Sequence, residues 1–206
     1  MRYVIGIDEA GRGPLAGPVA VGAVMVPLDF DWTQLEGVKD SKQLRPQIRE
    51  RIFTEIQAFE RRGKLKYAVR FSSSESIDRW GIVRAVRRAL ICALEAVEPD
   101  PAITTVLLDG SLYAPTHFID QRTIIRGDET EPIISLASIV AKVTRDRRME
   151  KLGESYPAWG FEGHKGYGTI EHRRVIARLG LSSEHRLSFC SGLRIGPKRV
   201  LERIAP

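Results

Sequence analysis

The sequence predicts an α/β protein in which a mixed five-stranded sheet is flanked by helices, with a small helical lobe at the C-terminal end. Five short runs rich in β-branched residues alternate with longer segments of helical periodicity, which is typical of strands joined by helical crossovers. A stretch dense in Gly and Pro between the first two runs predicts a hairpin, and therefore one antiparallel strand. After Tyr156-Pro157 this pattern gives way to Gly-rich loops and a short helix. We therefore divide the chain into a main domain, residues 1–155, and a lobe, residues 156–206.

The first two strands are predicted over residues 2–8, where the sequence reads RYVIGID, and over residues 16–27, which are rich in Val and small residues. Between them Gly and Pro are too frequent for helix or strand, so residues 11–18 are expected to form the turn of the hairpin. Three further short apolar runs complete the sheet. They lie at residues 66–71, 104–109 and 122–125.

Helical periodicity marks the segments between these strands. Residues 44–59 carry apolar side chains at spacings of four and three, which predicts an amphipathic helix. Residues 72–94 begin with three serines followed by a glutamate, a pattern typical of a helix start, so one capped helix that ends near Pro99 is expected there. Residues 132–152 predict a long helix with proline at an allowed first-turn position. A shorter helix is expected over residues 169–179.

Composition narrows the class of protein. The 206 residues are ample for one main domain. Hydrophobic residues make up 43% of the chain and charged residues 28%, a composition that excludes collagen-like, coiled-coil and wholly disordered chains. Cys92 and Cys190 belong to no CxxC motif, which excludes a zinc ribbon and a disulfide scaffold. No apolar run approaches the roughly 18–20 residues of a membrane span, and the first nine residues turn acidic where a signal peptide would stay apolar. We therefore expect a cytoplasmic protein without a membrane partner.

Positive charge is concentrated in the last third of the chain. The net charge is +6, and residues 142–203 hold 14 Lys or Arg against 7 Asp or Glu, while the preceding residues hold 18 against 19. Such a basic segment is expected where a protein lies against a polyanion such as nucleic acid. A solvated basic surface would show the same bias, so charge alone leaves both interpretations open.

Four acidic residues stand where a strand ends or a helix is about to begin: Asp8, Glu9, Asp109 and Asp128. Because the ends of neighbouring strands converge in an open α/β sheet, these residues can meet although they are far apart in sequence. Grouped carboxylates repel one another unless a cation compensates, and oxygen ligands suit Mg²⁺ or Mn²⁺. Two such ions about 3.5–4 Å apart can activate a water and stabilise the leaving oxygen of a phosphodiester. Each acid alone could equally be a turn or helix-capping residue.

Residues 6–18, GIDEAGRGPLAGP, resemble the N-terminal signature of the type 2 ribonuclease H family, ribonuclease HII. Further blocks resemble the same family in the same order along the chain. They are Asp40-Ser-Lys42, Leu108-Asp109-Gly110, Gly127-Asp128, ASIVAKVTRD at 137–146, YPAWGF at 156–161, HKGYGT at 164–169, and His185-Arg186 with Ser188-Phe189. The resemblance extends over residues 4–189, nearly the whole chain.

This resemblance implies an RNase H-like fold and a metal-dependent endoribonuclease that hydrolyses the RNA strand of RNA–DNA hybrids. Family members also nick duplex DNA on the 5′ side of a single embedded ribonucleotide, leaving 3′-hydroxyl and 5′-phosphate ends, with Mg²⁺ or Mn²⁺ in a two-metal mechanism. The family's metal-binding carboxylates correspond to Asp8, Glu9, Asp109 and Asp128. Its Gly-Arg-Gly motif corresponds to Gly11, Arg12 and Gly13, and its ribonucleotide-sensing tyrosine to Tyr167.

Physical chemistry is consistent with the implied recognition roles. A protein that detects one ribonucleotide must test for its 2′-hydroxyl. Glycine leaves backbone polar groups uncovered, so residues 11–13 could approach a sugar closely, and the ring of Tyr167 could stack on the next sugar or base. A hairpin turn and a partly buried aromatic of the lobe are the plainer interpretations of the same residues.

Basic residues within the matched blocks are candidates for phosphate contacts, which position a duplex without reading its sequence. They are Lys42, Lys142, Arg145 and Lys165. Each could instead be a solvated surface charge, and Lys142 could balance the carboxylates.

The remaining aromatic residues of the lobe predict no separate site. The spacings of His164, His172 and His185 match no local zinc motif. Trp159 and Phe161 are expected in the core of the lobe.

Two rival functions remain from the sequence. Another nuclease or strand-transferase of the same superfamily would share the carboxylates but not the Gly-Arg-Gly and tyrosine elements. A non-catalytic module that binds duplex nucleic acid would use the acids only structurally. The expected partners are RNA–DNA hybrids and ribonucleotide-containing DNA, and a monomer is the default expectation. The tail, residues 196–206, matches no motif.

Overall fold

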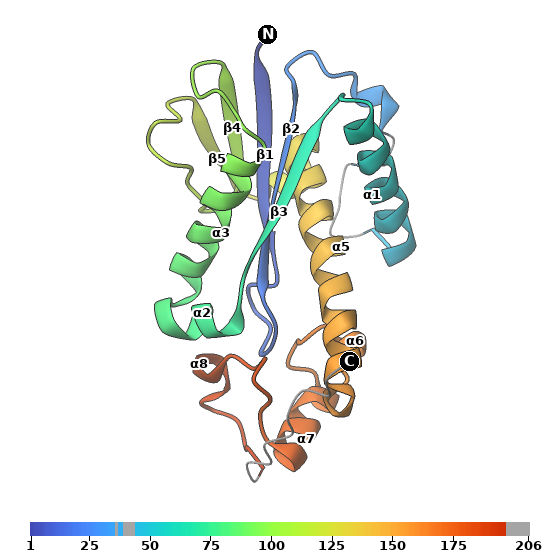
Figure 1. Cartoon of the computed structure of the whole chain (residues 1–206), viewed down its shortest axis with the longest axis vertical. Helices are drawn as coiled ribbons and strands as arrows, with labels where there is room; N and C mark the ends of the chain where they lie inside the picture. The colour runs from blue at the N-terminus through green and yellow to red at the C-terminus, as the bar shows by residue number, and fades with distance from the viewer. Residues whose placement is uncertain (36, 39–43, 197–206) are drawn as a thin grey trace. The chain divides into compact units, whose positions relative to one another are not determined.

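The structure is a computed structural model that describes residues 1–35, 37–38 and 44–196 (Figure 1). The predicted mixed five-stranded sheet is confirmed, with the strand order β3-β2-β1-β4-β5. Its strands are β1 (Tyr3–Ala10), β2 (Val19–Pro27), β3 (Lys66–Ser72), β4 (Thr104–Asp109) and β5 (Gln121–Ile124).

Strand pairing explains how distant parts of the chain meet. β1 and β2 form the predicted antiparallel hairpin, with Ala10 opposite Ala20. β1 runs parallel to β4, and Ile7 lies opposite Leu108 in that register. β4 in turn runs parallel to β5. Since parallel strands end at the same edge of a sheet, the residues that follow Ile7 and Leu108 are brought together at one edge.

All four predicted helical segments contain helix, but one of them is divided in two, and three four-residue helices of the described chain were not predicted. The helices are α1 (Pro46–Arg61), α2 (Ser74–Trp80), α3 (Ile82–Ala96), α4 (Gly127–Thr130), α5 (Pro132–Ser155), α6 (Phe161–His164), α7 (Ile170–Leu179) and α8 (Leu187–Cys190), with short 3₁₀ turns η1 (Trp32–Gln34) and η2 (Pro157–Trp159). The single helix expected over residues 72–94 is wrong, because it is divided into α2 and α3 at Gly81. Gly81 has φ +79° and its N–H donates to the Ile77 carbonyl, so this glycine ends α2 in a conformation that other residues rarely adopt.

The structure divides into two compact units. Unit 1 comprises residues 1–10, 20–71 and 86–143 and contains the sheet. Its core joins β2, α1 and the first half of α5 through buried apolar residues such as Val24, Ile52 and Ile139. Two glycines of the hairpin lie directly against the backbone of α5. A Cβ atom on Gly6 would overlap the Ile133 carbonyl, and one on Gly22 would lie 2.5 Å from the Ala137 carbonyl oxygen.

Unit 2 comprises residues 11–19, 72–85 and 144–206, of which 197–206 lie outside the described residues. It therefore takes in more of the chain than the lobe predicted from residue 156 onward. The reason is packing: Ala16 and Met149 belong to the same apolar cluster as Trp159 and Phe161. The prediction that Trp159 and Phe161 are core residues is confirmed. Within the described part of the chain, no helix is long and apolar enough to cross a membrane.

Candidate active site

The end of β1 carries a buried carboxylate in an unfavourable electrostatic environment. Asp8 is 2% exposed, and its Oδ1 accepts a hydrogen bond of 2.7 Å from the Glu9 N–H. Among the described residues, its Oδ2 atom is buried with no hydrogen-bond partner. Burial raises the pKa of Asp8 well above its usual value, and the charges of Glu9 and Asp109 raise it further, while a hydrogen bond from Ser138 acts in the opposite direction. The acids at the ends of β1 and β4 therefore interact, as the parallel register requires.

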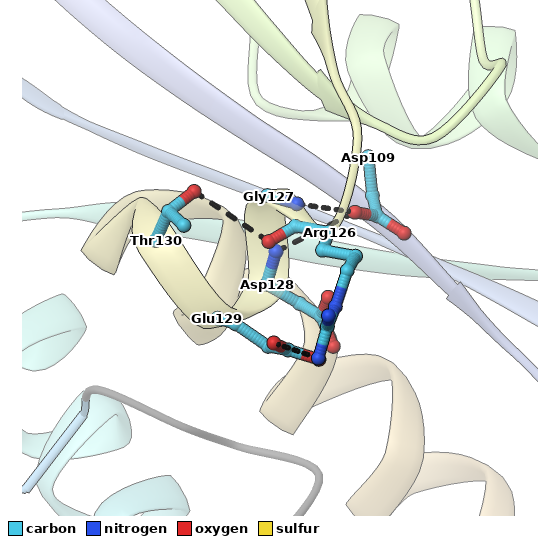
Figure 2. A network of polar contacts seen from close by, with 6 residues as sticks. All are labelled: Asp109, Arg126, Gly127, Asp128, Glu129 and Thr130. Atoms are coloured by element: carbon cyan, nitrogen blue, oxygen red, sulfur yellow. Dashed lines mark hydrogen bonds and ion pairs between the residues drawn. The ribbon is translucent and has the colours of Figure 1, made fainter.

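Asp109, at the end of β4, holds the start of the short helix α4 (Figure 2). Its Oδ1 accepts hydrogen bonds from the N–H groups of Gly127, at 2.8 Å, and Asp128, at 3.4 Å. The residue that precedes α4, Arg126, is left-handed (φ +56°) and its side chain does not cap the helix. Asp109 thus supplies from a neighbouring strand the acceptor that a helix N-terminus needs.

The contact between Asp109 and the start of α4 also fixes the position of Asp128. Asp128 is the second residue of α4 and is fully buried. Gly127 permits the close approach, because a Cβ there would lie 2.6 Å from Ile134 Cδ1 and 3.5 Å from Asp109 Oδ1. An ion pair of 2.6 Å between Arg126 and Glu129 spans the same turn on its exposed side (Figure 2).

The donor set fits a hard divalent cation by its chemistry. It consists of carboxylate oxygens only, and the unpartnered Oδ2 of Asp8 is a buried atom whose desolvation a cation would offset. In the residues that the structure describes, no three side chains of His, Cys, Asp or Glu converge closely enough to hold a metal ion as they stand.

Helix α5 carries Ser138, which is hydrogen-bonded to Asp8, and the candidate residue Lys142. Ser138, which lowers the pKa of Asp8, was not singled out by the sequence, where it is only a small polar residue in an apolar helix. Lys142 is half-buried and lies one turn further along the same face of α5. Lys42 lies outside the described residues.

In unit 2, residues 11–18 form a loop, here called the glycine loop, and three of its carbonyls accept from a single buried arginine. Arg186 is fully buried, and its Nε, Nη1 and Nη2 donate to the carbonyls of Gly17 at 2.9 Å, Arg12 at 2.9 Å and Gly11 at 2.7 Å. Burial and then the charge of Arg145 lower the pKa of Arg186 to about 9. Gly13 is exposed, and an added Cβ would meet no atom of the described residues within 4 Å. The loop therefore exposes backbone at Gly13 while its carbonyls at residues 11 and 12 point to Arg186.

Arg145 is placed differently from the phosphate-binding residue expected from the sequence. It is fully buried, and it donates from Nε to the Pro18 carbonyl at 2.9 Å and from Nη2 to the Lys165 carbonyl at 3.1 Å. A Cβ on Gly11, whose φ is +90°, would overlap Arg145 Nε. Arg145 thus packs against the glycine loop from within, and this contact explains why residue 11 is glycine.

Tyr167 lies in a tight turn, residues 164–169, here called the tyrosine turn. This residue is 42% exposed, and the Arg145 guanidinium lies 5.8 Å from the centre of its ring. The turn is bonded to the glycine loop, because the Leu15 N–H donates to the Gly166 carbonyl at 2.9 Å. Lys165, expected at a phosphate, is bonded through Nζ to Glu150 at 2.7 Å. The structure thus brings Tyr167 and the glycine loop together within unit 2.

Comparison with known proteins settles the family. The family model described as Ribonuclease HII matches residues 5–192. This chain belongs to the ribonuclease HII family. It is 44% identical over 189 residues to the ribonuclease HII of Bacillus cereus (strain AH820), covering 92% of this chain and 69% of that protein. It is similarly 45% identical over 190 residues to the ribonuclease HII of Bacillus anthracis (strain CDC 684 / NRRL 3495), with the same coverage.

Solved structures support the same assignment. The ribonuclease H2 of Pyrococcus horikoshii OT3 matches with a TM-score of 0.69 and 29% identity, covering 85% of each chain. The structure titled as the PCNA:RNase HII complex from Archaeoglobus fulgidus matches with a TM-score of 0.75 and 25% identity over 95% of this chain and 98% of that chain. The chain is therefore an endoribonuclease with ribonuclease H activity on an RNase H-like fold, as the sequence resemblance implied.

Proposed function

We propose that this ribonuclease HII cleaves the RNA strand of RNA–DNA hybrids and nicks duplex DNA on the 5′ side of a single ribonucleotide, leaving 3′-hydroxyl and 5′-phosphate ends. The observation that carries the proposal is the pairing, in unit 2, of exposed backbone at Gly13 with the half-exposed ring of Tyr167. Both elements are held by buried arginines. Recognition of one 2′-hydroxyl needs such fixed groups, because a mobile loop would spend part of its binding free energy on becoming ordered.

The carboxylates supply the second half of the proposal. Asp8, Glu9, Asp109 and Asp128 would hold Mg²⁺ or Mn²⁺, since these ions prefer oxygen ligands. When bound, two such ions activate a water and stabilise the leaving oxygen of the phosphodiester. Asp8 supports this assignment, because its pKa is raised by burial and by neighbouring charge. Asp109 serves both as a ligand and as the group that orients Asp128.

Basic side chains complete the proposed contacts with the substrate. Lys142 stands on α5 four positions after Ser138, and from there it would meet a phosphate next to the cleaved bond. We assign Lys165 and Arg145 instead to holding the tyrosine turn, since both are bonded to protein groups.

The test is a nicking assay with three labelled duplexes: all DNA, DNA with one ribonucleotide, and an RNA–DNA hybrid. We expect cleavage of the second and third in Mg²⁺ or Mn²⁺, none in chelator, and an intact all-DNA duplex, with the product ends mapped. Asp109→Asn serves as the catalytically impaired control. Cleavage of the all-DNA duplex would favour a different nuclease of the superfamily. Binding of all three without cleavage would favour a module that only binds duplexes.

A further inference from the structure

Two buried histidines of unit 2 form a hydrogen-bonded chain that ends on Tyr167. His172 and His185 are 0% and 2% exposed, and their Nε2 atoms lie 3.0 Å apart. His172 Nδ1 lies 2.9 Å from the Tyr167 carbonyl oxygen, and His185 Nδ1 lies 2.9 Å from the Ser182 backbone nitrogen. None of these contacts is needed for the metal chemistry proposed above.

The partners of the two rings determine where their protons are. A carbonyl oxygen can only accept, so His172 Nδ1 must donate to Tyr167. His185 Nδ1 lies 2.8 Å from the Ser182 Oγ as well as 2.9 Å from the Ser182 nitrogen. A hydroxyl can donate or accept, but a backbone N–H can only donate, so His185 Nδ1 accepts and carries no proton. The remaining contact is then satisfied only if His185 Nε2–H donates to His172 Nε2. Both rings are therefore neutral, with opposite tautomers, and the donors all point in one direction, from Ser182 to Tyr167.

The groups facing this pair also favour neutral rings. The ring of His164 stacks on His172, with centres 4.0 Å apart and planes at 14°. The Nε2 of His164 lies 2.8 Å from the Trp159 carbonyl oxygen, and its Nδ1 accepts from the Gly166 N–H at 3.2 Å. Phe161 packs against both His172 and His185, and the partners of the three rings within residues 1–35, 37–38 and 44–196 include no carboxylate.

The turn that the pair holds is strained without such support. Lys165 and Gly166 have φ values of +51° and +82°, and a residue such as lysine rarely adopts this left-handed conformation. The turn is held at several points: Tyr167 N–H donates to the His164 carbonyl, and the Tyr167 carbonyl accepts from both Thr169 N–H and His172. Of these two donors to the Tyr167 carbonyl, only the imidazole of His172 belongs to a side chain. Substitution of His172 can therefore remove its hydrogen bond and leave the backbone one in place.

His185 also connects the two recognition elements. It is followed directly by Arg186, which holds the glycine loop, and it forms an isolated β-bridge with Ala16 of that loop. One short segment therefore positions the loop through Arg186 and the tyrosine turn through His185 and His172.

We propose that His172 and His185 are positioning residues that set Tyr167 at the distance from the glycine loop required to read a single ribonucleotide. The inference rests on the proposed function of Tyr167 and deepens it. A DNA duplex with one ribonucleotide offers one productive register, so it depends strictly on where the ring stands. An RNA–DNA hybrid offers a 2′-hydroxyl in every register and tolerates a displaced ring. Loss of the pair should therefore lower cleavage at the single ribonucleotide more than cleavage of the hybrid.

The experiment compares His172→Phe, which keeps a ring but has no hydrogen-bonding group, with His172→Asn, whose side-chain amide can still donate to the Tyr167 carbonyl. The ratio of kcat/KM for the single-ribonucleotide duplex to that for the hybrid should fall about tenfold in His172→Phe, as expected for one lost hydrogen bond, and recover in His172→Asn. The exposed His117, substituted by Asn, is the control and should leave the ratio unchanged.

Nitrogen NMR of the wild-type imidazoles gives a readout independent of activity. Between pH 6 and 8 we expect His172 as the Nδ1–H tautomer and His185 as the Nε2–H tautomer. A charged ring or the reverse tautomers would overturn the proposal. A wild-type enzyme that nicks single ribonucleotides while His172→Phe keeps the wild-type ratio would overturn the positioning role alone. A wild-type enzyme that cuts only hybrids would overturn the proposed function, and this inference with it.

Discussion

Lowering the pH from 7.5 to 5 should destabilise the protein through the buried imidazoles of His172 and His185. Burial is the largest cause that lowers the pKa of His172 to about 4 and of His185 to about 3, from the usual 6.5. As the pH falls below 6.5, the unfolded chain therefore binds protons that the folded protein does not. Stability contributed by the neutral rings is complete above pH 6.5 and is lost as the pH approaches the folded values.

The size of the effect depends mainly on the unfolded state. Because both folded pKa values lie at or below about 4, neither ring is appreciably charged in the folded protein at pH 5. A pH of 5 lies about 1.5 units below the pKa of the unfolded imidazoles. At about 1.36 kcal/mol per unit, this lowers the free energy of unfolding by about 2 kcal/mol for each histidine. The two together remove about 4 kcal/mol, a large part of a typical total stability of about 5–15 kcal/mol.

Urea unfolding of the metal-free protein at pH 7.5, 6.5 and 5 measures this loss. Asp8 acts in the opposite direction, because its raised pKa means that acid relieves an unfavourable charge in the folded state. The comparison is therefore made between wild type and His185→Asn, in which Oδ1 can still accept from the Ser182 N–H. The change in unfolding free energy between pH 7.5 and 5 should be about 2 kcal/mol smaller in the variant. Equal pH dependence in both proteins would refute the reasoning, and His117→Asn should behave as wild type.

Three further predictions concern the site. Asp109→Asn should abolish cleavage yet keep or raise the metal-free melting temperature, because Asn Oδ1 still caps α4. Asp109→Ala removes this cap and should lower the free energy of unfolding in urea by about 1 kcal/mol. A large fall in the melting temperature of Asp109→Asn would assign Asp109 a structural role. Gly11→Ala should lower the free energy of unfolding by about 2 kcal/mol, since φ is +90° and the added methyl overlaps Arg145. An unfolding midpoint equal to that of the wild type would contradict the close packing. Arg186→Lys should lower the free energy of unfolding by about 1–3 kcal/mol, because one ammonium cannot reach the three carbonyls. The same variant should lower nicking more than duplex binding. Equal losses in nicking and binding would count against a role in shaping the loop.

The sequence was sufficient to predict the sheet and the meeting of Asp8 with Asp109. Both depend on local patterns, namely runs of β-branched residues and connections long enough to make two strands parallel. The cap that Asp109 provides to α4 was not predicted, because it depends on the left-handed Arg126 and on a contact between residues 18 positions apart. Gly81 was missed for a related reason, since one glycine inside a helical pattern is a weak signal.

The roles of the buried cations were beyond the sequence. Arg145 lies in a basic stretch of helix, where a solvated, a phosphate-binding and a buried arginine look the same until burial is known. Arg186 stood in a recognised block, but its partners Gly11 and Arg12 are more than 170 positions away. The histidines were set aside because they match no metal motif, and their hydrogen-bonded chain is visible only once α7 and the Ser182–Arg186 segment are folded together.

The direct contact of Gly6 and Gly22 with the backbone of α5 has a consequence for redesign of the enzyme. Where main chain meets main chain, the spacing between layers is set by rigid peptide groups and does not vary with the volume of neighbouring side chains. Asp8 stands two positions beyond Gly6, and Ser138 follows Ala137 on the helix. Apolar residues elsewhere in unit 1 could thus be exchanged to raise heat tolerance without shifting the acids, provided that these two glycines are left untouched.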